Sequence, residues 1–363
     1  MIDILRRYAV SRSLFPPTTL KRALHRMGFV QADPIRAPAR AQDLMLRHRV
    51  KNYRAGDLER RYSQLGVAED FFINYGFVTR EVQALMHPRL KSRASPWLWA
   101  SSGHRKRAEQ VLAFVRERGT VHPREVDRQF SHGKVTNYWG GSSNATTRLL
   151  DAMHYQGMLR VVGREAGIRL YTVHEHGPGP ANKAERDARI DALADLAVSI
   201  YAPLPARSLS SVIRRLGYAT PQWEREIPRA LQRAKQRLRR ERVEGVEWYW
   251  PAGEDPARSQ VEDRVWWLAP FDPVVWDRYR FGLLWGWQYR FEAYTPVAKR
   301  QRGYYALPLL WRDRVIGWVN VAQSNGELKT DFGYVEQAPH DPEFRRAQEA
   351  ERERLRAFLG LDA

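Results

Sequence analysis

Residues 143–173, SNATTRLLDAMHYQGMLRVVGREAGIRLYTV, carry the clearest order of elements in the chain. The first half, 143–156, has apolar positions at helical spacing, and the second half predicts two strands. The strands are joined at Gly163-Arg164-Glu165-Ala166-Gly167, whose glycines suit a hairpin turn. Upstream, residues 108–118 and 124–129 predict two helices with a short strand between them. This order of helices followed by a hairpin is typical of a winged helix.

The same order recurs later in the chain. Residues 183–200, 208–216 and 228–241 predict three helices, and residues 243–251 predict a wing. Beyond Pro256 the composition changes to short strands rich in Trp and Tyr, closed by a polar helix. Residues 1–30 predict a short helix-turn-helix-like start for an N-terminal unit. We therefore expect an α+β chain in which three tandem winged-helix units precede a β-rich domain. The units are predicted at 1–103, 104–180 and 181–255, the β-rich domain at 256–363, and its closing helix at 342–359.

The charge of the chain points to a polyanionic partner. Among 363 residues, 60 Lys and Arg stand against 41 Asp and Glu, which gives a net charge of +19. An excess of this size favours nucleic acid, although charge alone does not separate DNA from RNA or from a membrane surface.

Several classes of protein are excluded by what the sequence lacks. With no cysteine there is no disulfide framework, thiolate zinc site, thiol nucleophile or iron–sulfur cluster. No phosphate-binding Walker loop, dinucleotide fingerprint or HExxH motif occurs, so we assign neither a metal nor a cofactor. No apolar signal core or run of membrane-spanning length occurs, and we expect a cytoplasmic protein.

The stretch Gln31-Ala32-Asp33-Pro34-Ile35 is the candidate catalytic element. Pro34 pushes Asp33 away from helical backbone, and on an extended strand Gln31 and Asp33 share one face. An amide beside a carboxylate can position and polarise a water molecule. By spacing alone, however, Gln and Asp near a turn are more often solvated loop residues or helix caps.

Candidate DNA contacts follow this pair and recur at the second unit. Residues 37–52 predict a helix whose basic face is either solvated or holds phosphates. The candidate phosphate contacts here are Arg36, Arg40 and Arg47. The helix at 143–156 would be the recognition helix of its unit, used for DNA contact or for packing. The residues near its start are Asn144, Thr147 and Arg148.

A third basic set lies in the β-rich domain. Lys299, Arg300 and Arg302 are close in sequence to Tyr304 and Tyr305, which offers phosphate donors beside stacking surfaces. Alternatively, Arg300 or Arg302 pairs with Asp272 or Asp277 and locks the β-rich domain.

Three stretches together resemble the AlkZ and YcaQ family of winged-helix DNA glycosylases. The first is Val30-Gln31-Ala32-Asp33-Pro34-Ile35 with Arg40 following, and the second is Tyr138-Trp139-Gly140. The third and most specific joins 268–278 (LAPFDPVVWDR), 289–296 (YRFEAYTP) and 299–304 (KRQRGY). The resemblance implies three winged helices scaffolded by a barrel-like β domain around a concave DNA-binding surface.

The resemblance also implies an activity. Gln31 and Asp33 match the Gln-x-Asp branch of the family's catalytic signature, in which the carboxylate activates a water that the amide holds. The expected substrate is double-stranded DNA with alkylated purines of the N7-alkylguanine type, or with interstrand crosslinks to unhook. The enzyme would be monofunctional, cofactor-free, monomeric and nucleoid-associated. Where YcaQ-like members carry Trp-x-His-Glu, this chain aligns Phe72-Ile73-Asn74-Tyr75.

A second class of function fits the same units. Tandem winged helices with a large positive charge are also expected of a DNA-binding or regulatory protein without catalysis. Such a protein has no reason to direct Gln31 and Asp33 into its DNA-binding surface. The surroundings of Asp33 therefore distinguish a glycosylase from a non-catalytic DNA-binding protein.

Overall fold

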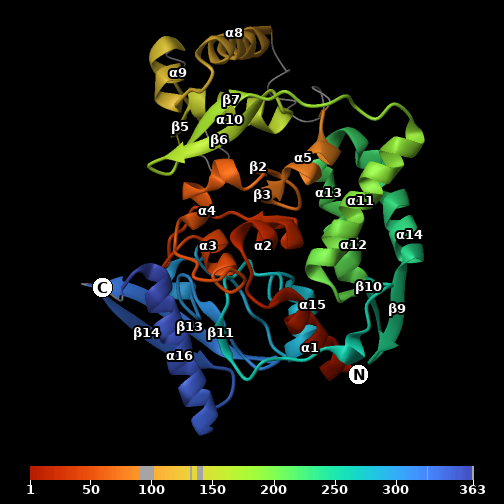
Figure 1. The fold of residues 1–363 in the computed structure, drawn as a ribbon, viewed down its shortest axis with the longest axis vertical. Helices are drawn as coiled ribbons and strands as arrows, with labels where there is room; N and C mark the ends of the chain where they lie inside the picture. The colour runs from red at the N-terminus through yellow and green to blue at the C-terminus, as the bar shows by residue number, and fades with distance from the viewer. Residues whose placement is uncertain (90–101, 131–132, 137–141, 325, 362–363) are drawn as a thin grey trace. The chain divides into compact units, whose positions relative to one another are not determined.

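The computed structural model describes residues 1–89, 102–130, 133–136, 142–324 and 326–361. The Tyr138-Trp139-Gly140 stretch lies outside the described residues. The chain divides into two compact units, each built from segments far apart in sequence, and Figure 1 labels their elements. The first unit contains Met1–Leu58, Asp195–Val212 and Gln232–Ala363, and the second contains Glu59–Ala194 and Ile213–Leu231. The four consecutive domains expected from the sequence stay a prediction.

Two helices and a short strand open the first unit. They are α1 (Ile2–Ser13), α2 (Leu20–Met27) and β1 (Phe29–Gln31). The chain turns sharply from α2 into β1 at Gly28, whose φ of 66° is left-handed. The left-handed φ favours glycine here, and a Cβ would also displace the tip of the Leu196 side chain, 2.5 Å away.

Helix α3 (Ala41–Leu46) is much shorter than the helix expected over 37–52, so that expectation is wrong at both ends. Pro38 disfavours helical backbone at the residue before it. At the other end Arg49, fully buried, donates to the backbone O of Ser13 (2.9 Å) and to both carboxylate oxygens of Asp272 (2.8 and 2.9 Å). Tertiary contacts therefore decide the path of the chain where the sequence pattern indicates a helix.

Four antiparallel strands form the main sheet of the first unit. In sheet order they are β11 (Val265–Trp267), β12 (Leu307–Trp311), β13 (Arg314–Ser324) and β14 (Glu327–Tyr334). β11 and β14 are its edges and do not pair with one another, so no closed, barrel-like sheet is found in the described residues. Strands thus occur in the region where the sequence predicts them, and the β-rich domain itself stays a prediction.

Helix α16 (Pro342–Leu359) has the bounds predicted from the sequence and packs on this sheet. Its Phe344 ring contacts Trp311, with 5.6 Å between centroids, and the buried Glu351 carboxylate accepts a hydrogen bond from the backbone N–H of Trp267 (3.0 Å). Near the sheet, α15 (Arg278–Trp285) begins at Asp277, whose carboxylate accepts from the backbone N–H of Arg280. Asp277 is thus a helix cap.

A smaller sheet contains β8 (Leu204–Pro205), β10 (Val246–Pro251) and β9 (Leu238–Val243) in that order. The helix predicted over 228–241 is wrong in its last turn, because α14 (Ile227–Arg237) ends where β9 begins. Arg-rich sequence favours a helix, but β9 pairs along its whole length with β10, which supplies buried Trp248 and Trp250.

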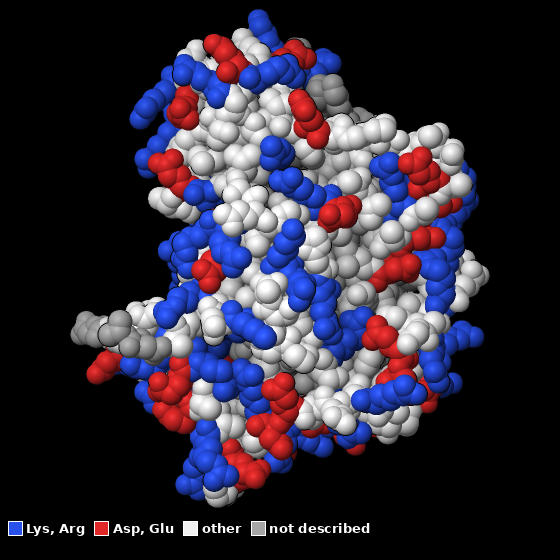
Figure 2. Space-filling view, in the orientation of Figure 1, with Lys and Arg blue, Asp and Glu red and all other residues white. Residues whose placement is uncertain are grey.

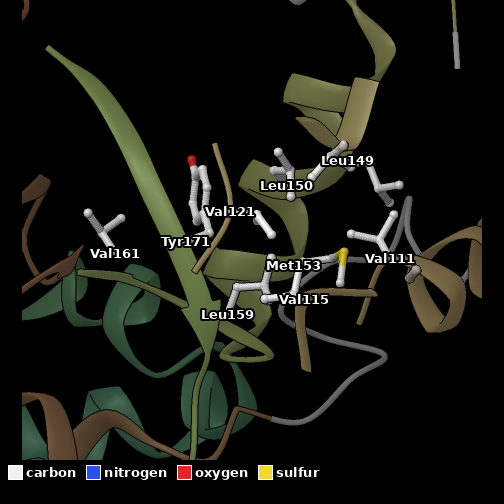
Figure 3. Close-up of a cluster of buried hydrophobic side chains, with 11 residues drawn as sticks. Val111, Val115, Val121, Leu149, Leu150, Met153, Leu159, Val161 and Tyr171 are labelled. Atoms are coloured by element: carbon white, nitrogen blue, oxygen red, sulfur yellow. The ribbon is translucent and has the colours of Figure 1, made fainter. Parts of the chain in front are cut away.

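The second unit contains the helices and hairpin predicted around residues 143–173. They are α8 (Ser102–Arg118), α9 (Pro123–Phe130), α10 (Ala145–Gln156), β6 (Leu159–Glu165) and β7 (Ile168–Val173). Figure 3 shows their shared apolar core, in which α8, α10 and the hairpin contribute Val111, Val115, Leu149, Leu150, Met153, Leu159 and Tyr171. Ala166 and Gly167 have positive φ, as the tight hairpin turn requires.

A second hairpin lies in the same unit. β2 (Val67–Phe71) and β3 (Tyr75–Thr79) pair antiparallel and lead into α5 (Arg80–Met86). The remaining elements, from both units, are β4 (Lys134–Thr136), β5 (Ser142–Asn144), α4 (Asp57–Arg60), α11 (Lys183–Tyr201), α12 (Ala206–Arg214) and α13 (Leu216–Ala219). Four short 3-10 helices complete the chain: η1 (Tyr62–Gln64), η2 (Pro221–Glu226), η3 (Pro256–Arg258) and η4 (Val297–Lys299). Among the described residues, no helix combines the length and apolar character needed to span a membrane.

Candidate active site

Gln31 is held in place by a tryptophan from a distant part of the chain. It is the last residue of β1 and is only 5% exposed. The indole Nε1–H of Trp276 donates a 3.1 Å hydrogen bond to Gln31 Oε1, and Trp276 itself packs on Tyr201 with 4.6 Å between ring centroids. Because an indole N–H can only donate, this contact fixes the orientation of the amide and leaves its NH₂ group as a donor.

Asp33 lies in a loop, not on the strand. β1 ends at Gln31, so the shared strand face expected for the two residues is not formed in that way. Instead, Asp33 Oδ1 accepts a hydrogen bond from the backbone N–H of Ile35 (2.9 Å), which fixes the carboxylate across Pro34. The half-buried Asp33 forms no ion pair with any residue of the described chain.

The surroundings of Asp33 favour its protonated form. Burial raises the pKa of Asp33 above the ordinary value of 3.8, and the hydrogen bond from Ile35 opposes this only in part. A carboxylate with a raised pKa is a stronger base than one in water.

Two tyrosines lie within the electrostatic reach of Asp33. After the larger effect of burial, the Asp33 charge contributes to the raised pKa of both Tyr294 and Tyr305. Tyr294 is 76% exposed, whereas Tyr305 is buried. The ring of Phe291 contacts both, with centroids 6.0 Å from Tyr294 and 5.2 Å from Tyr305. Tyr294 and Tyr305 therefore belong to one aromatic cluster around Phe291.

The three arginines expected to bind phosphate near the pair have different surroundings. Arg36 is exposed in the loop after Asp33, and Arg40 is half-buried at the start of α3. The side chain of Arg47 is only 3% exposed, and its guanidinium donates to Glu351 (2.5 Å) and to the backbone O of Trp267 (3.0 Å). The expectation for Arg47 is corrected accordingly, because a side chain enclosed with its own counter-ion cannot contact DNA.

Of the basic set in the β-rich region, Lys299 is exposed in η4. Arg300 is half-buried, donates to the backbone O of Thr295 (2.9 Å) and lies 5.1 Å from the centre of the Tyr304 ring. Arg302 donates to the backbone O of Gln288 (2.8 Å), lies 3.8 Å from the Glu292 carboxylate and packs over Trp287 and Trp318. Arg302 thus stabilises the local fold through Glu292. Its partner is neither Asp272 nor Asp277, the two carboxylates considered from the sequence.

The residues predicted near the start of the recognition helix lie in the second unit. Asn144 is the N-cap of α10: its side-chain oxygen accepts from the backbone N–H groups of Thr146 and Thr147, and its Nδ2 donates to Asp127 (3.1 Å). The Asn144 side chain is therefore already used within the chain. Thr147 and Arg148 are exposed on the first turn of α10.

Asn74 occupies the turn of the β2–β3 hairpin. Its side-chain oxygen accepts from the backbone N–H of Tyr75 (2.9 Å), and its backbone O accepts from Phe72 N–H (3.0 Å). Asn74, where YcaQ-like proteins carry histidine, therefore acts as a turn residue here.

A buried polar network behind this hairpin was not found from the sequence. Asp70 accepts hydrogen bonds from Gln83 (3.0 Å) and His87 (2.8 Å) and pairs with Arg89 (2.9 Å). Burial alone would raise the pKa of Asp70, but Arg89 and His87 hold it well below its ordinary value. No group of three or more metal-ligating side chains occurs in the part of the chain that the structure describes.

Comparisons with known proteins establish the class and the family. The solved structure of Streptomyces sahachiroi DNA glycosylase AlkZ has a similar fold, with a TM-score of 0.64 and 15% identity, over 98% of this chain and 96% of that chain. A family model described as DNA glycosylase AlkZ-like matches residues 24–358. The mixed α/β fold is thus the fold of a DNA glycosylase. The chain belongs to the AlkZ-like DNA glycosylase family, which confirms the resemblance drawn from the sequence.

Proposed function

We propose that this DNA glycosylase hydrolyses the N-glycosidic bond of N7-alkylated purines in double-stranded DNA, with Asp33 activating the attacking water. The observation that carries the proposal is the state of Asp33. It is half-buried, its pKa is raised by burial, and it has no ion-pair partner in the described chain to neutralise it. A structural carboxylate of this kind would normally be paired.

The chemistry of an N7-alkylated purine suits a site with one carboxylate. As the base departs, positive charge develops on the deoxyribose, and a nearby carboxylate stabilises it. An N7-alkylated purine is already cationic and leaves with the electron pair of the glycosidic bond, so it needs little help from a general acid. Asp33 takes a proton from the water as the oxygen bonds to C1′, while the Gln31 NH₂ donates a hydrogen bond that orients the water.

This route is monofunctional and needs no cofactor. Water is the nucleophile, so no covalent bond forms between protein and sugar, and the products are a free base and an intact abasic site. The same hydrolysis at one of the two purines of an interstrand crosslink would unhook the strands. We extend the proposal to crosslinked duplexes on that ground.

For DNA binding we propose the arrangement expected from the sequence, three winged-helix units and the β-rich region forming a concave basic surface. Figure 2 shows Lys and Arg side chains spread over the face drawn, with fewer Asp and Glu among them. The candidate phosphate contacts that stay accessible are Arg36 and Lys299, with Thr147 and Arg148 on α10. Contacts to phosphates fix the position of a duplex without reading its sequence.

If the protein were a non-catalytic regulator, the surroundings of Asp33 would be different. It would place this carboxylate in a salt bridge, away from any ligand. The carboxylate is instead half-exposed and has no ion-pair partner in the described chain, which favours catalysis.

The experiment is incubation of the protein with a duplex that carries one N7-methylguanine, followed by separate assays for free base and for strand breaks. We expect free base and alkali-labile abasic sites, with no strand cleavage before alkali treatment. Strand cleavage by the protein alone would contradict the monofunctional route. Absence of free base would contradict the proposed substrate.

Lys299→Ala should weaken binding to any duplex sequence and reduce the slope of log K against log salt by about one. Lys299 is exposed and replacing it removes one phosphate contact, so the melting temperature should not change. Arg302→Ala is the matched control from the same segment. It should lower the melting temperature and leave the salt slope unchanged, because Arg302 holds Glu292 and two tryptophan rings. Titrations at several salt concentrations test both, and an unchanged slope in Lys299→Ala would show that Lys299 does not bind phosphate.

Trp276→Phe should lower the single-turnover rate of base release by roughly tenfold while duplex affinity stays the same. Phenylalanine keeps a ring against Tyr201 but cannot donate to Gln31 Oε1, so the amide is free to rotate. Rates and binding constants measured on one preparation check this. A loss of affinity with no change in rate would show that Trp276 does not act through Gln31.

A further inference from the structure

The loop that precedes β12 presents several large side chains to solvent. Tyr294 is 76% exposed, Val297 is 75% exposed and Tyr304 is 46% exposed. Lys299, which is also exposed, lies between them in the sequence. Large apolar and aromatic side chains seldom gather on a surface unless a partner covers them. The 294–304 loop therefore has the character of a contact surface.

The base of the 294–304 loop is firmly held. The buried carboxylate of Glu292 accepts hydrogen bonds from the backbone N–H groups of Gln301 and Arg302, both of 2.9 Å. Asn320 of β13 donates to the backbone O of Arg302 (2.7 Å), which ties the loop to the main sheet. The exposed side chains are thus carried on a fixed support, and less conformational entropy is lost when they bind a partner.

Ring contacts connect Tyr294 with the segment that orients the Gln31 amide. The Phe291 ring contacts both Phe271 and Tyr294, with centroids 5.2 and 6.0 Å away. Phe271 lies five residues before Trp276, whose indole N–H donates to Gln31 Oε1 (3.1 Å). The same short segment therefore positions the amide and, through Phe291, supports the exposed tyrosine.

We propose that Tyr294 inserts its ring into the base stack of the substrate duplex beside the damaged purine and holds that base step open. This inference rests on the proposed function. A glycosidic bond inside a stacked duplex is poorly accessible, so the enzyme must disturb the stack to reach it. Aromatic side chains stack on bases of any sequence, and side chains wedged between base steps unstack them. Lys299 of the same loop supplies a cation for the neighbouring phosphate.

The test uses a duplex with 2-aminopurine, whose fluorescence rises when it is unstacked, next to N7-methylguanine. The wild type should raise the fluorescence on binding, before base release. Tyr294→Ala should abolish this rise and lower the single-turnover rate of base release by roughly tenfold. Tyr294→Phe keeps the ring and should behave as the wild type. In a duplex that mispairs the damaged purine, the deficit of Tyr294→Ala should shrink, because less unstacking is needed.

Tyr279→Ala is the matched control. Tyr279 is also exposed, but the guanidinium of Arg207 already covers its ring, 4.7 Å from the centroid. This variant should keep the fluorescence rise and the rate. The insertion of Tyr294 would be overturned, and the proposed function left standing, if the wild type released base without a fluorescence rise or if Tyr294→Ala kept both the rise and the wild-type rate. A rise in the wild type that depends on Tyr294 but is followed by no base release would support the insertion and contradict the proposed substrate.

Discussion

Asp33→Asn should lower the rate of base release by about 10²- to 10⁴-fold, the range that removal of a general base produces. Asparagine keeps the size of the side chain and a hydrogen bond from Ile35 N–H, but it cannot take a proton or stabilise a developing cation. Single-turnover assays with an N7-methylguanine duplex measure the effect. Duplex binding should be nearly intact, because no phosphate contact is removed.

The melting temperature of Asp33→Asn shows whether a lower rate of base release comes from lost catalysis or from misfolding. The pKa of Asp33 is raised in the folded protein, so its contribution to stability is full below the ordinary carboxyl pKa and is lost as pH rises through the folded value. Above its folded pKa the ionised Asp33 therefore opposes folding, and in that pH range asparagine should give an equal or higher melting temperature. Release at the wild-type rate would show that Asp33 is not catalytic.

Asp272→Ala should destabilise the protein by about 3 to 5 kcal/mol, which is the largest stability effect that we expect. Asp272 and Arg49 are both fully buried and joined by two hydrogen bonds of 2.8 and 2.9 Å. Removing the carboxylate leaves a guanidinium enclosed without its counter-ion. Because Arg49 also binds Ser13 and Met45, the change affects three segments of the first unit.

The matched control is Asp263→Ala, which breaks an ion pair of similar length with Arg312 (2.6 Å). Asp263 is on the surface, with a side chain 73% exposed, so the loss should be below about 1 kcal/mol. Thermal and denaturant unfolding of both variants test the contrast. Equal losses would show that burial does not set the strength of these pairs.

Elements with strong local signals could be predicted from the sequence. The bounds of α16 and the presence of a hairpin between 158 and 173 follow from apolar spacing and turn residues, which act over a few positions. The turn itself is shorter than the predicted 163–167, because β6 continues through Glu165 and only Ala166 and Gly167 lie between the strands. The first part of β9, residues 238–241, was predicted as helix because its arginines favour helix locally, while its pairing with β10 depends on residues across the turn. The helix over 37–52 failed for the same reason at Arg49, whose partner Asp272 is 223 residues away.

The same distinction between local signals and long-range contacts applies to the candidate site. Gln31 and Asp33 could be selected from five consecutive residues, since the argument needs only their chemistry and a proline. No local signal connects Gln31 with Trp276, because folding alone brings these two residues together. Arg47 was assigned to DNA because a cation in a basic stretch is usually exposed, and its pairing with Glu351 in α16 is visible only in the structure.

The most direct test of Asp33 as the base is the pH dependence of single-turnover base release, from about pH 4 to pH 8, in the wild type and in Asp33→Asn. A carboxylate must be ionised to accept a proton from water. We therefore predict that the wild-type rate falls with decreasing pH through one ionisation above the ordinary carboxyl value of 3.8, and that Asp33→Asn lacks this ionisation. A wild-type rate that does not change across this range, or the same ionisation in Asp33→Asn, would contradict the account.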